Sequence, residues 1–450
     1  MYDVIVIGGG PGGYVAAIRL SQLGKKVALI EKNHLGGTCT NVGCIPTKAL
    51  LTASHLYTDI ISKSKKFGIK VENISYELSD MMKHMNKSVT MSRKGIEYLM
   101  KKNNIDVYNG TGIIEDNTHV KIKETSEILE GEYLILAHGS VPSIFPPFNE
   151  IEGIWTSDDV FKMSELPDSI VIIGGGVIGV EFATFFASLG KEVHVVELAD
   201  HILPFEDEDI ALEIKKSLVK KGVKVYEKTK VKDVNESYVV IAESENGEIE
   251  LSANRVLLAV GRRPNIPEDV KNLGVKIERG IVTDNTMKTN IDNIYAIGDI
   301  RAKIMLAHVA MFEGIVAAHN IAGEKLEMDY NAVPSIIFSN PEVASTGLKE
   351  KDLDPDKIIV GKFPVSANGR ARTMEEREGF AKVIADKETK KVLGFAVVSP
   401  SATDMIMEGV LAVKHGLTVE EISNSIHPHP TLTETILGAF EDAEGLALHI

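Results

Sequence analysis

The two cysteines of the chain, five positions apart, are candidates for redox chemistry. Cys39 and Cys44 lie in GGTCTNVGCIPTKALL, residues 36–51, and the 450-residue chain contains no other cysteine. A chain of this length does not need one short disulfide to stabilise its core, so a redox role is the first hypothesis. A structural disulfide and an unreactive buried thiol pair remain alternatives, whereas a structural zinc site would need histidines as further ligands.

Cys44 is predicted to lie at the start of a helix that covers residues 45–63. Pro46 supports this start, because proline is favoured in the first helical turn. A helix N-terminus stabilises a thiolate and lowers the thiol pKa from its free value of about 8.5. Lys48 comes four residues after Cys44, so we expect its ammonium group on the same face of the helix, near the redox centre.

A histidine near the C-terminus is the candidate acid-base group. His429 stands between Pro428 and Pro430, and Glu434 follows five positions later. The prolines restrict the backbone and could fix where the imidazole points, and a histidine oriented by a carboxylate can move a proton to or from a thiol. Taken alone, the segment also fits a surface or helix-capping histidine. With His427 it could form a pair of metal ligands, although no cysteine or acidic cluster accompanies them in sequence.

Two glycine-rich segments with the same layout predict two dinucleotide sites. Residues 4–31 and 170–197 each combine an apolar strand, a glycine turn, a helix followed by LGK and a second strand that ends in glutamate. The first glycine makes the tight turn, the second lets a pyrophosphate approach the backbone, and the third lets helix and strand pack closely. The helix N-terminus offers amide hydrogens to phosphates, and the glutamate can accept hydrogen bonds from ribose hydroxyls. The positions are Gly8, Gly10, Gly13 and Glu31 in the first copy and Gly174, Gly176, Gly179 and Glu197 in the second.

A plain glycine-rich crossover is the alternative for either copy alone, and the repetition of the whole pattern argues against it for both. The other expected elements are helices at 45–63 and 76–102, short strands within 105–136, a Pro-rich crossing into a second domain at 141–148, a hairpin at 239–251 that turns at Asn246-Gly247, and a buried strand at 289–300. From about residue 337 the pattern becomes antiparallel and is followed by helices. This last part of the chain therefore predicts a separate α+β domain.

Composition limits the class of protein. Hydrophobic residues make up 44% and charged residues 25% of the chain, which are globular values. The formal net charge of −15 disfavours general binding to nucleic acid or to an anionic membrane. No apolar run is long enough for a membrane helix, and the chain begins with a strand-like segment rather than a leader, so a cytoplasmic location is expected.

The motifs together resemble the flavin disulfide reductases from end to end, and most specifically the dihydrolipoamide dehydrogenase family. The matching segments are GGTCTNVGCIPTKALL, GGGVIGVEF, AVGRRPN, YAIGDI, MLAHVA, VPSIIFSNPEVASTG, GKFPVSANGRA and HPHPTLTE. The resemblance implies an α/β fold with two Rossmann-like dinucleotide-binding domains, one for FAD and one for NAD, and a C-terminal α+β dimerisation domain. The implied boundaries are 1–145 for the first part of the FAD domain with its redox-active disulfide, 146–265 for the NAD domain, 266–336 for a central segment that completes the FAD domain, and 337–450 for the dimerisation domain.

The resemblance also implies the roles of the site residues. Cys39 is implied to be the thiol that meets substrate, and Cys44 the thiol against the flavin. Lys48 is implied to lie near flavin N5 and to pair with Glu181, while His429, supported by Glu434, serves the thiols of the other subunit. The implied FAD contacts are Gly8, Gly10, Pro11, Gly13, Glu31, Lys32, Gly37, Thr38, Lys48, Gly112, His138, Gly139, Ser140, Asp299, Met305, Leu306, Ala307 and His308. The implied NAD contacts are Gly174, Gly176, Val177, Ile178, Gly179, Glu181, Glu197, Val231 and Gly261. No metal is implied.

The implied reaction is the NAD-dependent oxidation of dihydrolipoamide to lipoamide by a homodimer. His429 removes a thiol proton, the substrate thiolate attacks the Cys39 sulfur, Cys44 leaves as a thiolate, and the electrons pass through FAD to NAD+. The implied partners are lipoyl domains of a 2-oxo acid dehydrogenase or glycine cleavage system.

Three other functions remain open. Glu197 disfavours an NADPH-dependent glutathione reductase, because its charge would repel a 2′-phosphate. A mercuric reductase would carry a further C-terminal cysteine pair, and a non-catalytic flavin-binding assembly protein would leave the cysteines without a purpose. The sequence departs from the family pattern at His138, where threonine is usual, at Val309, where lysine is common, and at Asp404, where glutamate is usual.

Overall fold

The first glycine fingerprint forms the centre of a mainly parallel sheet. β1 (Tyr2–Ile7) pairs in parallel with β2 (Val27–Glu31), and α1 (Pro11–Gln22) connects them. The sheet is completed by β3 (Asp106–Asn109), β4 (Gly112–Ile114), β5 (His119–Ile122), β6 (Ile128–Leu136) and β17 (Ile294–Ala296). Its order is β3-β2-β1-β6-β5-β4, and β17 also pairs with β6. The computed structural model describes all residues, 1–450.

Three helices are inserted between β2 and β3. They are α2 (Gly37–Val42), α3 (Cys44–Lys63) and α4 (Leu78–Lys102). The expected helices at 45–63 and 76–102 are therefore confirmed, with shifts of one and two residues at their starts. Since α3 packs against α4 and also against α6 (Val177–Ser188), which belongs to the second glycine fingerprint, the cysteine segment lies between the folds of the two fingerprints.

The second fingerprint forms an entirely parallel sheet. Its strands are β8 (Trp155–Thr156), β9 (Ser169–Ile173), β10 (Glu192–Val196), β11 (Lys224–Tyr226) and β15 (Arg255–Leu258). The helices between them are α5 (Ser157–Val160), α6 (Val177–Ser188) and α7 (Glu208–Lys220). The strand order is β11-β10-β9-β15-β8. The register pairs Ile170 of β9 with Val193 of β10, so that buried apolar side chains stand in adjacent rows.

The hairpin after this sheet is present, but its turn lies one residue earlier than predicted. A small antiparallel sheet contains β12 (Lys230–Val234), β13 (Val239–Ser244) and β14 (Gly247–Ser252). Ser244 pairs with Gly247, so Glu245 and Asn246 make the connection. Gly247, with a positive φ of 113°, is the first residue of β14 and lies outside the two-residue connection.

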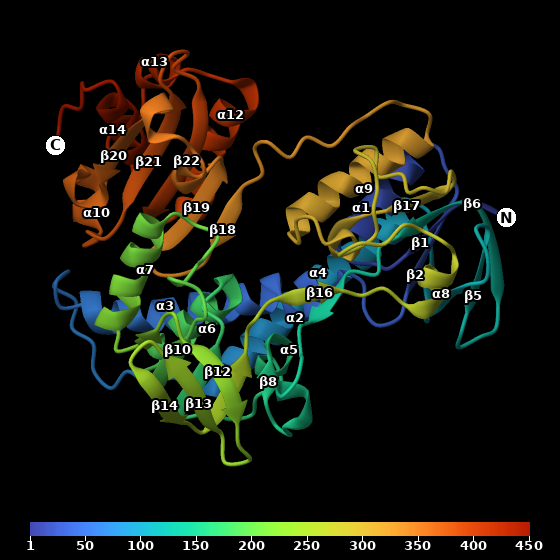
Figure 1. The fold of residues 1–450 in the computed structure, drawn as a ribbon, viewed down its shortest axis with the longest axis horizontal. Coiled ribbons are helices and arrows are strands. Elements are labelled where there is room, and N and C mark those ends of the chain that lie inside the picture. Colours follow the sequence, from blue (N-terminus) through green and yellow to red (C-terminus); the bar gives the residue numbers. More distant parts are fainter.

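The chain leaves and re-enters the first domain through two strands that lie side by side. β7 (Ser140–Pro142) pairs antiparallel with β16 (Arg262–Pro264), and α8 (Glu268–Asn272) follows. β17 is shorter than the strand predicted at 289–300. Thr289 Oγ1 accepts a hydrogen bond from the Ile291 N–H and donates to the Ile294 carbonyl, which holds a turn before the strand. α9 (Ala307–Ile321) then lies against α1, as Figure 1 shows by the orange and blue helices near the N-terminus.

The C-terminal part forms a separate antiparallel sheet with helices, as the pattern predicts. The strand order is β18 (Ser335–Ile337), β19 (Glu342–Gly347), β22 (Val392–Ser399), β21 (Phe380–Asp386) and β20 (Ile358–Pro364). The helices are α10 (Gly369–Thr373), α11 (Ala402–Met405), α12 (Met407–His415), α13 (Val419–Ser423) and α14 (Glu434–Ala443). In Figure 1 this part, coloured orange to red, lies beyond α7 and away from the sheet of β1 and β2. No helix in the structure combines the length and apolarity needed to cross a bilayer.

Candidate active site

The two cysteines form a disulfide at the junction of two helices. Cys39 lies within α2, and Cys44 is the first residue of α3. Gly43 joins the helices, and a β-carbon there would come within 3.0 Å of the Thr38 carbonyl oxygen. A glycine at this position therefore lets α3 start directly against α2, which brings the two sulfurs together. The expected position of Cys44 at a helix N-terminus is confirmed.

Lys48 is held beside the disulfide by residues from two other parts of the chain. Its Nζ lies 2.9 Å from both carboxylate oxygens of Glu181, which is nearly buried on α6. The backbone N–H of Phe338 donates to Glu181 Oε1 at 3.1 Å, and the Lys48 ammonium stands 4.6 Å from the centre of the Phe338 ring. The Lys48–Glu181 pair implied by the resemblance is therefore present, and a charge is fixed one helical turn from Cys44.

A continuous cleft of about 1870 Å³ joins the disulfide to both glycine fingerprints. Cys39, Cys44 and Lys48 line it, as does every residue expected to contact FAD. Every residue expected to contact NAD lines it except Gly179, which lies beneath the turn. A methyl group at Gly179 would overlap the carbonyl oxygen of Gly174, so this glycine acts through close packing.

The two glycine turns have the same geometry and fit dinucleotides. In the first, both oxygens of Glu31 accept backbone N–H bonds, from Gly9 at 2.7 Å and from Asn33 at 2.8 Å. In the second, Glu197 accepts equivalent bonds from Gly175 at 2.6 Å and Ala199 at 2.7 Å. Each carboxylate is thereby fixed beside its turn, where ribose hydroxyls can donate to it. Neither α1 nor α6 has a side-chain cap at its N-terminus, so backbone N–H groups face the cleft for phosphates.

Asp299 lines the same cleft as the first glycine turn, although it comes from a distant part of the chain. Ser140 Oγ donates to Asp299 Oδ2 at 2.6 Å. Burial raises the pKa of Asp299, and the Ser140 hydrogen bond and the Arg262 charge oppose that rise. Met305, Leu306, Ala307 and His308 stand at the start of α9 on the same cleft.

Arg262 is a cleft residue that the sequence reasoning did not single out. Its guanidinium donates to Ser140 Oγ at 2.9 Å and to the Ser140 carbonyl at 3.0 Å, and it also pairs with Asp158 at 3.3 Å. Arg262 thus ties the turn at 138–140 to the second domain. The AVGRRPN motif contained this residue, but its partners are more than a hundred positions away in sequence.

His138, where the family usually has threonine, lines the cleft wall, and both of its ring nitrogens are buried without a hydrogen-bond partner. Burial lowers its pKa to about 4, so the imidazole is neutral near pH 7. Two ring nitrogens without partners on a nucleotide cleft fit a polar ligand. Val309 is buried on α9, and Asp404 lies on α11, away from this cleft.

His429 and Glu434 pair with each other but do not line the cleft of their own chain. His429 Nδ1 lies 2.8 Å from Glu434 Oε1, and the imidazole is 77% exposed. His427 has a different partner, Glu408, at 2.8 Å from its Nε2. The structure contains no group of three or more histidine, cysteine, aspartate or glutamate side chains placed to hold a metal ion.

Comparisons with known proteins agree with this architecture along the whole chain. Residues 2–314 match the model of the pyridine nucleotide-disulphide oxidoreductases, and residues 333–440 match the dimerisation domain of the same family. Among solved structures, LpdA from Mycobacterium tuberculosis has a TM-score of 0.89 at 26% identity and covers 99% of this chain and 100% of its own. The HOCl-induced flavoprotein disulfide reductase RclA from Escherichia coli has a TM-score of 0.86 at 28% identity, with 98% and 99% covered.

Curated relatives are closer in sequence. A dihydrolipoyl dehydrogenase of Chlamydia trachomatis is 43% identical, with 96% of this chain and 95% of the relative covered. One of Geobacillus stearothermophilus is 40% identical, with 100% and 97% covered. Together with the disulfide, the two nucleotide turns and the separate C-terminal sheet, these matches show that the chain belongs to the pyridine nucleotide-disulphide oxidoreductase family.

Proposed function

We propose that the chain catalyses the NAD+-dependent oxidation of dihydrolipoamide to lipoamide, with FAD as its bound flavin. The observation that carries this proposal is the Cys39–Cys44 disulfide at the N-terminus of α3, on the one cleft that also contains both nucleotide turns. The full-length similarity to curated dihydrolipoyl dehydrogenases supports the choice of substrate. FAD and NAD+, when bound, carry the two electrons that the disulfide takes from substrate.

Thiol-disulfide exchange at this pair conserves atoms and electrons. A base takes the proton of one substrate thiol, and the thiolate attacks Cys39 Sγ, so that the Cys39–Cys44 bond breaks and Cys44 leaves as a thiolate. The second substrate thiol then attacks the substrate sulfur of the mixed disulfide, so that the bond to Cys39 breaks and the cyclic disulfide of lipoamide forms. Cys39 is freed and takes up the proton of that thiol. The N-terminus of α3 and the Lys48 charge favour the Cys44 thiolate, and a favoured thiolate is a good leaving group.

His429 is the proposed base, and Glu434 is its positioning partner. The Glu434 carboxylate holds Nδ1, which leaves Nε2 to accept the thiol proton. Since the pair lies outside the cleft of its own chain, we assign it to the disulfide of the other subunit of a homodimer. The match to a dimerisation domain supports this arrangement.

We assign residues 1–145 and 266–336 to FAD binding, 146–265 to NAD binding and 337–450 to the dimer contact. The pairing of β17 with β6 supports the return of the central segment to the first domain. The proposed partners are the lipoyl domains of a 2-oxo acid dehydrogenase or glycine cleavage system, and the proposed location is the cytoplasm.

The deciding experiment compares turnover with NAD+ and dihydrolipoamide against turnover with NADPH and oxidised glutathione. We expect the first pair to be used and the second to be poor. Because Glu197 would repel a 2′-phosphate, we also expect NAD to be preferred over NADP by at least about tenfold. Turnover of glutathione without turnover of dihydrolipoamide would refute the proposal, and a protein that holds FAD but turns over neither pair would favour a non-catalytic role.

A further inference from the structure

Residues 198–207, which make up most of the loop between β10 and α7, form part of the wall of the NAD side of the cleft. Leu198, Pro204 and Phe205 line the cleft, and the Phe205 ring is 84% exposed. The loop is also bonded to the nucleotide turn, because the N–H of Leu203 donates to the Gly175 carbonyl at 2.8 Å. Gly175 in turn donates to Glu197. A shift of this loop would therefore move both the cleft wall and the turn.

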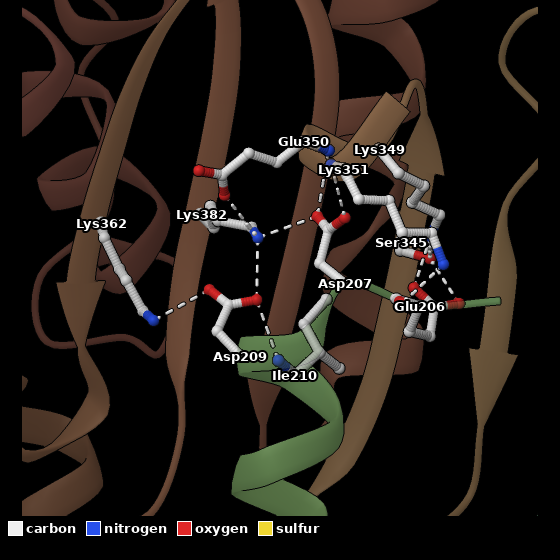
Figure 2. A network of polar contacts seen from close by, with 10 residues as sticks. All are labelled: Glu206, Asp207, Asp209, Ile210, Ser345, Lys349, Glu350, Lys351, Lys362 and Lys382. Atoms are coloured by element: carbon white, nitrogen blue, oxygen red, sulfur yellow. Dashed lines mark hydrogen bonds and ion pairs between the residues drawn. The ribbon is translucent and has the colours of Figure 1, made fainter. Parts of the chain in front are cut away.

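Lysines of the C-terminal domain hold the loop from its far side. Lys351 Nζ donates to the carbonyl of Pro204 at 2.8 Å and to that of Glu206 at 2.9 Å. Lys349 pairs with the Glu206 carboxylate, which also accepts a 3.1 Å hydrogen bond from Ser345. Figure 2 shows the contacts of Glu206 with Lys349 and Ser345 on the right of the network. Phe205 is thus flanked by two residues whose backbone carbonyls are fixed by one lysine.

Lys382 on β21 is the centre of the same network. Its side chain is 1% exposed, and Nζ lies 2.8 Å from Asp207, 2.8 Å from Asp209 and 3.1 Å from Glu350. Asp207 also accepts backbone N–H bonds from Glu350 and Lys351, each at 3.2 Å. Figure 2 shows Lys382 between the end of the loop and the start of α7.

Lys382 and Asp207 both stay ionised in this network, because each stabilises the charge of the other. Burial lowers the pKa of Lys382, but hydrogen bonds and charges from Asp207 and Asp209 outweigh burial and raise it overall. Burial raises the pKa of Asp207, but Lys382 and the two backbone donors bring it below its usual value. Breaking such a pair leaves an unpaired charge in a buried place, so the ionised contact is expected to persist.

We propose that Lys349, Lys351 and Lys382, here called the lysine clamp, are positioning residues through which the dimerisation domain sets the affinity of the cleft for the ADP-ribose half of NAD. This inference rests on the proposed function only for the identity of the nucleotide. The clamp acts on the loop and, through Leu203 and Gly175, on the turn expected to receive the pyrophosphate. The nucleotide site is then only fully formed when the C-terminal domain is docked on α7.

The test uses Lys351→Met in the full-length FAD-loaded dimer, titrated with ADP-ribose in a calorimeter. Lys351 is exposed, so its replacement should leave the fold intact. Losing two charge-assisted hydrogen bonds to the loop should raise the dissociation constant of ADP-ribose by about fivefold to tenfold. The KM for NAD+ should rise in parallel, while the KM for dihydrolipoamide should change less than about twofold. Lys351→Arg should restore most of the affinity, because it keeps the charge and donors.

Lys220→Met is the matched control. Lys220 on α7 also pairs across to the C-terminal domain, with Glu378 at 2.5 Å, but it touches neither the loop nor the turn. ADP-ribose affinity should be unchanged in this variant. Equal losses in Lys220→Met and Lys351→Met would overturn the proposal in favour of a general effect of domain contact, and an unchanged affinity in Lys351→Met would overturn it outright.

Lys382→Met tests the centre of the clamp. It should weaken ADP-ribose at least as much as Lys351→Met, and Lys382→Arg should recover part of the loss. If Lys382→Met does not fold, the two Lys351 variants decide. A wild-type protein that binds ADP-ribose but does not oxidise dihydrolipoamide would refute the proposed substrate and leave the clamp open to the same titrations.

Discussion

At the scale of single residues, the two cysteines of the disulfide have different environments, although their sulfurs are bonded to each other. Cys44 begins α3 and stands one turn from the Lys48 ammonium, whereas Cys39 lies inside the short helix α2. The positive end of α3 and the lysine charge both favour a thiolate at Cys44. The two residues should therefore differ in function.

Replacing each cysteine by serine tests this difference. Cys39→Ser should retain a Cys44 thiolate and show long-wavelength flavin absorbance in the resting protein, and Cys44→Ser should lack that band. Both variants should lose at least about a hundredfold in turnover, because neither can form the disulfide. Absorbance spectra at equal flavin content provide the measurement. A band that survives in Cys44→Ser and is lost in Cys39→Ser would reverse the assignment.

At the scale of elements, the segment between α13 and α14 carries His429 and is anchored by its neighbour His427. His427 Nε2 contacts Glu408 at 2.8 Å, and Nδ1 contacts the Ser425 carbonyl at 2.9 Å. The Glu408 hydrogen bond raises the pKa of His427; burial opposes this rise, and the Ser425 carbonyl and Glu434 add to it. The segment that contains the proposed base is thus held by the His427–Glu408 contact, whose strength depends on the protonation of His427.

The sign of the pKa shift gives a pH dependence of stability. A raised pKa means that the contact stabilises the fold fully below the unfolded-state value of about 6.5, and that this contribution is lost as pH rises through the folded-state pKa. The difference in melting temperature between wild type and His427→Gln should therefore be larger at about pH 6 than at about pH 8.5. His84→Gln, at an exposed position on α4, is the control and should show no such trend. A difference that does not change with pH would contradict the role of His427.

At the scale of the whole molecule, one chain holds both nucleotide turns and the disulfide on one cleft, but its proposed base faces solvent elsewhere. His429 is exposed on the C-terminal domain, and its ring does not line the cleft. Catalysis should therefore need two chains. Loss of general acid-base catalysis typically costs about 10² to 10⁴ in rate, so a chain without a partner should be nearly inactive.

Mixing two inactive variants measures this dependence. Cys44→Ser and His429→Ala should each be nearly inactive as homodimers. After subunit exchange, each heterodimer has one site with both changes and one with neither, so about half of wild-type activity per heterodimer should return. Exchange is verified with subunits that carry different affinity tags. If exchanged subunits recover no activity, His429 serves its own chain or is not the base.

Features that depend on short spacings follow from the sequence alone. The two glycine turns, the helix start at Cys44, the helices at 45–63 and 76–102 and the C-terminal antiparallel pattern all follow from residues close together in the chain. Their physics is local: the backbone freedom of glycine, the fixed φ of proline and the period of apolar side chains. The family resemblance supplied the long-range Lys48–Glu181 pair, which no local pattern predicts.

Contacts between distant residues are set by the packing of the whole fold. The pairing of β17 with β6, the bonds of Arg262 to Ser140 and the clamp of Lys382 on Asp207 and Asp209 join residues more than a hundred positions apart. From sequence alone, a strand lysine such as Lys382 is expected to be exposed to solvent. Its burial among three carboxylates becomes visible only when the packed domains are known. The predicted bounds of the hairpin turn and of β17 differ from the structure for a related reason. The ends of a strand depend on the register of its partner strand and on side-chain hydrogen bonds to the backbone.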